Sequence, residues 1–291
     1  MANVLQRRLI TPRDLEILSA LDRSPLTVEQ LLKLSTTWQK PFTSARRVRE
    51  RMHELTEAGW VKKSLYATAT SGGSPAYFQL TLTGFRIIYG NTAKPTTKRH
   101  LNGIAISHQH HTRCLADFIV HTIVCADRHG IAMTDFCAEN SCRFAVGDDS
   151  IWPDSAFRLI APGGYPFNFV VELDNSTETV RSQRDADSWE RKIRLYDQFQ
   201  DVCERRFRVL VVTTRSQERL KHILDAAQAL QRNRWRSLFY GVYLPDYLQQ
   251  SDAIRGACFL DHRGRPIALV RKATKPVTKT LPSQILVPAI S

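Results

Sequence analysis

The sequence contains no apolar run that approaches the roughly 18 residues of a membrane-spanning helix. Its first residues also lack the apolar core that a secretory signal peptide would need. Both absences argue against a membrane partner, and we expect a soluble protein of the cytoplasm. Hydrophobic residues nevertheless make up 43% of the chain, which is enough for a packed core and argues against wholesale disorder.

The six cysteines form no CxxC pair, which argues against a zinc site of the finger type. Cys137 and Cys142 lie closest together along the chain, but no second Cys/His pair follows them at finger-like spacing. We therefore expect six ordinary reduced thiols, as in most intracellular proteins.

Acidic residues are scarce as well: 28 Asp and Glu stand against 41 Lys and Arg, and the net charge is +13. Such an excess attracts polyanions, of which nucleic acid is the commonest for a soluble protein. Because many basic proteins have no such partner, the charge has to be read together with the positions of the basic residues along the chain.

Three helix signatures follow one another in the N-terminal third. Thr11 and Pro12 suit the start of the first helix, and Thr27 with Gln30 predicts a capping box at the start of the second. The third stretch, "TSARRVRERMHELTEAGWV", has apolar residues at helical spacing and ends at Gly59. These patterns predict three short helices in succession.

A hairpin is predicted next, because alternating residues run up to the tip "SGGSP" and alternate again after it. "LTLTGFRIIYG" then indicates one more short helix. Three helices followed by a basic hairpin is the order of a winged helix-turn-helix, which we assign to residues 8–92. The third helix would enter the major groove and the hairpin would lie along phosphates. The basic residues of this surface are Arg46, Arg47, Arg49, Arg51, Lys62 and Lys63.

These basic residues have a plainer interpretation as the solvated face of a helix, and some winged helices bind protein instead of DNA. Here the arginines stand on the helix that such a fold presents to DNA, beside a basic hairpin. That combination favours contact with double-stranded DNA.

The remaining two thirds predict a single large domain over residues 104–271, joined by a linker at 93–103 and followed by a flexible basic tail at 272–291. A helix closed by Gly130 precedes three strands, the last two joined by the turn "PGGYP". A helix, an apolar strand, a helix, a strand and a late hairpin follow. This order predicts an α/β fold of the mixed α+β type, with a central mixed sheet flanked by helices.

Two acids, Glu172 and Asp174, end an apolar strand and face the same way because they are two residues apart. A turn centred on Gly163-Gly164 would bring Asp154 of the preceding strand opposite Glu172. Three carboxylates this close repel one another, and a cation that accepts oxygen ligands, Mg²⁺ or Mn²⁺, would offset the repulsion. We therefore predict a metal site here. In the plainer alternative, the acids end a strand and pair with surface arginines.

The following helix carries Lys192 at the border of its apolar stripe, which consists of Trp189, Ile193 and Tyr196. A lysine in this place can reach the carboxylates. In phosphodiester hydrolysis it would orient the attacking water or stabilise charge on the phosphate. Tyr196 has two interpretations, core packing or a covalent phosphotyrosine nucleophile, and its place in the stripe favours packing.

"PD" at Pro153-Asp154, a strand ending in "VEL" and the order of the elements resemble the PD-(D/E)XK nuclease superfamily, which has the restriction-endonuclease-like fold. That motif ends in lysine where this chain has Asp174, and many members carry the lysine on the following helix, as Lys192 would be. More narrowly, "TPRDLEILSAL", "YFQLTLTG", "VELDNSTE" and "KIRLY" resemble the replication-relaxation family, which includes the MobC-class plasmid relaxases.

This resemblance implies catalytic and metal-binding roles for Asp154, Glu172 and Lys192, with Asp174 as an additional acid and Glu139 as an auxiliary ligand. It implies a metal-dependent DNA endonuclease, a relaxase or nickase that recognises a plasmid transfer or mobilisation origin and works beside other relaxosome proteins. One alternative is a catalytically degenerate nuclease fold that acts as a DNA-binding regulator or accessory of plasmid replication or transfer. Another is a defence or repair nuclease. The oligomeric state stays open.

A cluster of histidines, His108, His110 and His111, resembles the metal-binding histidines of the other, HUH-type relaxases. That motif places His-apolar-His on a strand. Here the cluster opens a predicted helix, so we do not expect HUH chemistry from it.

Overall fold

The computed structural model describes residues 9–67, 75–95, 101–139, 141–176, 178–181, 188–233 and 235–271. The chain divides into two compact units, Met1–Ala116 and Asp117–Ser291. The division falls inside the long helix α5 (Ile106–Asp127). The predicted tail at 272–291, the tip of the predicted hairpin and residues 96–100 of the predicted linker lie outside the described residues.

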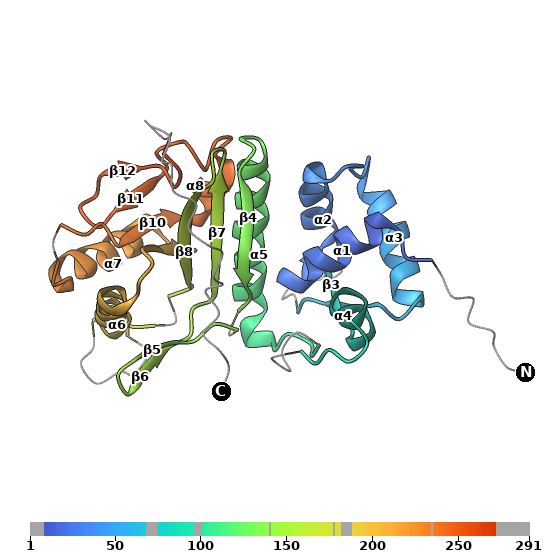
Figure 1. Cartoon of the computed structure of the whole chain (residues 1–291), viewed down its shortest axis with the longest axis horizontal. Helices are drawn as coiled ribbons and strands as arrows, with labels where there is room; N and C mark the ends of the chain where they lie inside the picture. Colours follow the sequence, from blue (N-terminus) through green and yellow to red (C-terminus); the bar gives the residue numbers. More distant parts are fainter. Residues whose placement is uncertain are drawn as a thin grey trace, which may run out of the picture. The chain divides into compact units, whose positions relative to one another are not determined.

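The described part of the first unit combines short helices with a small antiparallel sheet (Figure 1). Its helices are α1 (Pro12–Arg23), α2 (Val28–Leu34), the 3₁₀ helix η1 (Ser35–Thr37), α3 (Ala45–Glu57) and α4 (Leu82–Tyr89). Its strands are β1 (Leu26–Thr27), β2 (Val61–Leu65) and β3 (Ala76–Leu80), which lie in the order β1-β3-β2. The prediction of three helices, a hairpin and a further short helix is confirmed.

The helix starts follow from side chains that bond the first free backbone N–H groups. Thr11 accepts a hydrogen bond from the amide of Asp14, and the Asp14 carboxylate accepts one from the amide of Thr11. Thr27 and Gln30 form the same reciprocal box at α2. At the other end of α3, Gly59 has a positive φ of 72°, which a glycine adopts without the steric cost of a side chain.

The second unit is built on a seven-stranded sheet of order β12-β11-β10-β9-β8-β7-β4. Its central strand β9 (Phe207–Thr213) runs parallel to β8 (Tyr165–Asp174) and β10 (Phe239–Tyr243). The outer strands join antiparallel and are β4 (Ala132–Cys137), β7 (Ser155–Ala161), β11 (Phe259–Asp261) and β12 (Pro266–Ile267). The predicted central mixed sheet flanked by helices is confirmed.

Helices α6 (Trp189–Val202) and α7 (Gln217–Leu230) pack on one face of this sheet (Figure 1). One buried cluster contains Val170, Val209 and Val211 of the strands together with Ile193, Tyr196 and Ile223 of the helices. Helix α8 (Leu244–Gln249) packs elsewhere, with the ring of Tyr247 5.0 Å from that of Phe118 on α5. None of the described helices combines the length and apolarity needed to cross a membrane.

Three local features were not predicted. Strands β5 (Phe144–Val146) and β6 (Asp149–Ile151) form a separate hairpin, and each is too short to carry a readable alternation. Helix α8 is also short. The expectation of six reduced thiols is wrong for Cys137 and Cys142, which form a disulfide. The chain turns back after β4 and brings their Cα atoms to 6.1 Å, a proximity that their spacing alone did not reveal.

Candidate active site at the end of the β7–β8 hairpin

The register of the β7–β8 hairpin brings Asp154 beside Glu172. Ser155 pairs with Val171, so the next position outward on each strand places these two acids opposite one another. The Asp154 amide donates to the Val171 carbonyl at 3.1 Å, and its Oδ2 accepts from the Leu173 amide at 2.7 Å. Asp154 therefore extends the backbone hydrogen bonding of β7 and β8 by one residue, and its side chain bonds the next amide of β8. This agrees with the register predicted from the turn at Gly163-Gly164.

Glu172 is 1% exposed and bonds two side chains of α6. Lys192 donates from Nζ to its Oε2 at 2.8 Å, and the Tyr196 hydroxyl donates to its Oε1 at 2.5 Å. Lys192 also pairs with Glu178 at 2.7 Å. The predicted reach of Lys192 to the carboxylates is thus present, and its ammonium group is shared between two of them.

Burial sets the electrostatics of this group. Loss of solvent raises the pKa of Glu172 to about 7, although Lys192 lowers it, while Asp154 adds to the rise. Burial lowers the pKa of Lys192, but the charges of Glu172 and Glu178 outweigh it and leave that pKa above its usual range. Burial, with the charge of Glu172, raises the pKa of Tyr196 well above its ordinary value. Near neutral pH, Lys192 and Tyr196 therefore keep their protons and Glu172 is the group that titrates.

Asp174 faces α6 and α7, as the alternation predicted, but its oxygens have partners of their own. It is 4% exposed, and Arg219 of α7 donates to it twice, from Nε at 3.0 Å and from Nη2 at 2.8 Å. The indole N–H of Trp189 donates to Oδ1 at 3.0 Å. Asp174 thus ties the end of β8 to both helices, and among the described residues neither Asp174 nor Glu172 belongs to a group of three side chains at metal-ligand spacing.

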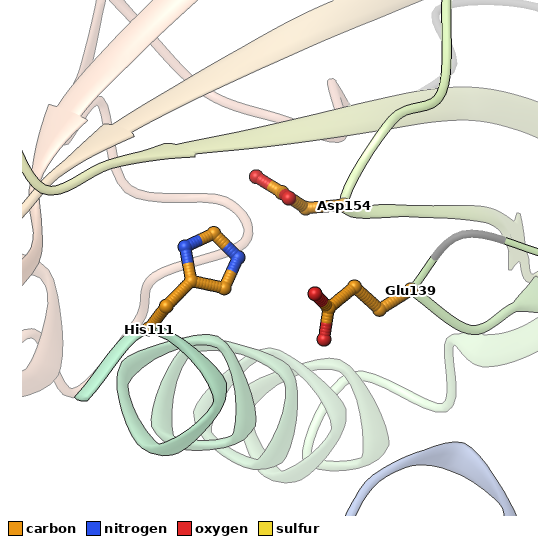
Figure 2. A group of neighbouring side chains, drawn as sticks. All are labelled: His111, Glu139 and Asp154. Carbon is orange, nitrogen blue, oxygen red and sulfur yellow. The ribbon is translucent and has the colours of Figure 1, made fainter. Parts of the chain in front are cut away.

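Asp154 instead lies near Glu139. The nearest carboxylate oxygens of the two side chains lie within 4.8 Å of one another, and both residues are partly buried. Figure 2 shows the two carboxylates pointing toward a common space. Glu139 comes from the loop between Cys137 and Cys142, so the disulfide closes the segment that carries it. Carboxylate oxygens are ligands that a divalent cation such as Mg²⁺ or Mn²⁺ accepts.

Sequence reasoning missed two members of this region. Glu178 is the last residue of "VELDNSTE", and it follows the strand, so the alternation of the strand gives no indication of where its side chain lies. Arg219 lies 45 residues from its partner Asp174, beyond the range of any local pattern.

Five of the six predicted DNA-binding residues of the first unit are exposed. Arg46, Arg47 and Arg49 are exposed on α3, with Glu50 and Glu29 as nearby acids. Lys62 and Lys63 are exposed on β2.

Arg51 differs from these residues because it is only 19% exposed. It pairs with the buried Asp14 at 2.5 Å and with Glu54 at 2.7 Å. Its guanidinium group therefore joins α3 to the start of α1.

A family model described as replication-relaxation matches residues 19–212, which is more than half of the chain. The matched stretch contains Asp154, Glu172 and Lys192. No curated protein and no solved structure matches the chain.

Proposed function

The chain belongs to the replication-relaxation family, and from this premise we propose that it is a DNA relaxase or nickase. Family membership by itself points to a role in plasmid replication or transfer. The finer proposal is that the protein recognises a transfer or mobilisation origin in double-stranded DNA and cuts one strand with the help of a divalent metal ion.

The observation that carries this proposal is the 2.8 Å contact between Lys192 and Glu172 at the end of the hairpin that also holds Asp154. Cleavage of a phosphodiester needs a fixed cation where negative charge develops on the phosphate. The chain has Asp174 where the resembling nuclease motif has lysine. The contact supports the idea that Lys192, from the following helix, takes over that place.

A divalent ion fits the donors beside it. Asp154 and Glu139 would hold the ion, since Mg²⁺ and Mn²⁺ both accept carboxylate oxygens. When bound, the ion would supply Lewis-acid stabilisation of the scissile phosphate. Binding can be measured without activity, by electron paramagnetic resonance of Mn²⁺. The Asp154→Asn and Glu139→Gln variants should bind at least about tenfold more weakly, whereas Glu218→Gln, an exposed acid on α7, should not change binding.

The chain's own residues would act as follows. Lys192 keeps its proton and would donate to a phosphate oxygen or hold the attacking water. Tyr196 donates to Glu172 and fixes its orientation. A fully buried, neutral phenol that already donates to a carboxylate is poorly suited to attack phosphorus. We therefore assign the attack to water and a positioning role to Tyr196.

We assign recognition of the origin to the first unit, with a winged-helix arrangement in which α3 enters the major groove. The three exposed arginines of α3 and the lysines of β2 support this assignment, since both elements present positive charge. Binding by several phosphate contacts should weaken steeply as salt increases.

One observation favours a second candidate, a nuclease fold without activity that serves as a DNA-binding regulator or accessory protein. Lys192 is held between Glu172 and Glu178, and Asp174 is neutralised by Arg219. A site whose charges are already paired needs no metal to balance them. The two candidates differ in whether wild-type protein cuts DNA.

The test is conversion of supercoiled plasmid to open circles with Mg²⁺ or Mn²⁺, on plasmids with and without the cognate origin. Glu172→Gln and Lys192→Ala should abolish nicking, while Lys221→Ala, an exposed lysine on α7, should retain it. Nicking confined to the origin plasmid and lost in both site variants supports the nickase. Sequence-specific binding by a wild type that never cuts would establish the regulatory alternative.

A further inference from the structure

A hollow of about 770 Å³ lies in the second unit at the starts of its central strands. Its walls include residues at the beginning of β8, at the beginning of β9 and in the loop that leads to β10. The β8 residues that line it end at Phe169, and Glu172 stands three residues further along the strand, roughly 10 Å at about 3.3 Å per residue. None of Asp154, Glu172 and Lys192 lines the hollow. This strand-start pocket is therefore separate from the candidate active site.

The walls of the strand-start pocket are rich in arginine. Four arginines stand against two acids, and the arginines are Arg206, Arg208, Arg236 and Arg271. Asp201 restrains Arg236, while the guanidinium group of Arg208 bonds the Tyr240 hydroxyl at 3.2 Å and lies 5.7 Å from the centre of its ring. These contacts hold the guanidinium groups of Arg236 and Arg208 in place, and the excess of arginines over acids favours an anionic ligand such as phosphate.

An exposed tryptophan stands at the rim of the pocket. Trp235 is 89% exposed, which is unusual for the largest apolar side chain. It also lines a second hollow of about 300 Å³, and Arg263 lies 5.7 Å from the centre of its ring. Beside it the Ser237 hydroxyl is buried and has no hydrogen-bond partner among the described residues. An aromatic face, arginines and an unused polar group together suit a nucleobase with its phosphates.

We propose that the strand-start pocket binds single-stranded DNA, with one base stacked on Trp235 and the adjoining phosphates at Arg206 and Arg208. Stacking on an exposed indole requires an unpaired base, so a duplex does not fit this mode. The strand would be one that is free or displaced near the origin. Binding does not depend on cleavage, and the inference therefore goes beyond the proposed nickase activity.

The test measures the affinity of the full-length protein for a fluorescent oligothymidylate of about 12 nucleotides, by anisotropy and with a chelator present to prevent cleavage. All proteins carry Arg46→Ala, Arg47→Ala and Arg49→Ala, so that the basic helix of the first unit contributes little. Trp235→Ala should weaken binding about tenfold or more, since stacking on one aromatic ring is worth about 1–3 kcal/mol per base.

Two further variants separate stacking from charge. Trp235→Phe should retain most of the affinity but lose the quenching of tryptophan fluorescence that DNA produces in the parent. Arg206→Ala should weaken binding several-fold. It should also make the plot of log affinity against log salt concentration less steep by about 0.7, which is the contribution of one single-stranded phosphate. Arg194→Ala removes an exposed arginine of α6 that does not line the pocket, and it should leave that slope nearly unchanged.

Three outcomes would overturn the proposal. Equal binding by Trp235→Ala and the Arg194→Ala control would remove the stacking platform. Deoxythymidine monophosphate could compete as well, per mole, as the oligonucleotide, which would identify a nucleotide pocket instead. Duplex of the same length could bind equally and depend equally on Trp235. Failure of the protein to nick DNA would not change the interpretation of these binding measurements, because none of them requires cleavage.

Discussion

Replacing Lys192 by methionine should destabilise the second unit in a pH-dependent way. In the wild type, burial raises the pKa of Glu172 from 4.5 to about 7. A carboxylic acid whose folded pKa is raised contributes stability that is fully present below the unfolded pKa and is lost as pH rises through the folded pKa. At 1.36 kcal/mol per pKa unit, the loss is about 3 kcal/mol between pH 4.5 and 7, after which this contribution is constant.

Methionine keeps most of the volume of lysine but removes the charge that lowers the pKa of Glu172. The folded pKa should therefore move above 7, and the loss of stability should continue into the alkaline range at about 1.4 kcal/mol per pH unit. The difference between Lys192→Met and wild type should thus be small near pH 5.5 and reach about 2 kcal/mol near pH 8.5, which lies 1.5 pH units above the wild-type pKa.

The measurement is urea unfolding at about pH 5.5, 7 and 8.5, with pulsed hydrogen exchange so that peptides of β8 and α6 report on their own unit. Lys221→Met is the matched control and should show no such pH dependence. Adding Glu172→Gln to Lys192→Met should remove most of the pH dependence of the destabilisation, leaving the smaller share that Glu178 contributes. An equal destabilisation at all three pH values would refute the reasoning, because it would show that Lys192 acts through packing alone.

Three further predictions concern other parts of the chain. Arg51→Ala should destabilise the first unit by about 3 kcal/mol in a thermal melt, because it leaves buried Asp14 unpaired, whereas Arg46→Ala should hardly change stability; equal melting temperatures would contradict this. Arg219→Ala should cost a similar amount in the second unit by stranding the carboxylate of Asp174, and Asp174→Asn in the same chain should recover part of the loss. Thiol titration of unfolded, unreduced protein should find four reactive thiols, rising to six after reduction; six before reduction would exclude the disulfide of the β4–β5 loop.

Much of the fold followed from interactions that are local in sequence. Thr11 and Thr27 cap their helices with residues three positions away, so a short stretch contains both partners. The β7–β8 register followed from the turn at Gly163-Gly164, since a tight turn and the two-residue period of a strand fix every opposite pair. Short segments such as β5, β6 and α8 carry too few residues for a period to be recognised.

The sequence by itself determined that Glu172 faces α6 near Asp154 and that Lys192 lies within reach, because strand alternation and helical spacing are set by the backbone. Only the tertiary structure decided which charges are neutralised. Arg219 takes Asp174 out of the carboxylate group, and Glu178 shares Lys192 with Glu172. Such partners come from different elements, and their pairing depends on how helices and strands pack, since charge and burial act across space regardless of distance along the chain.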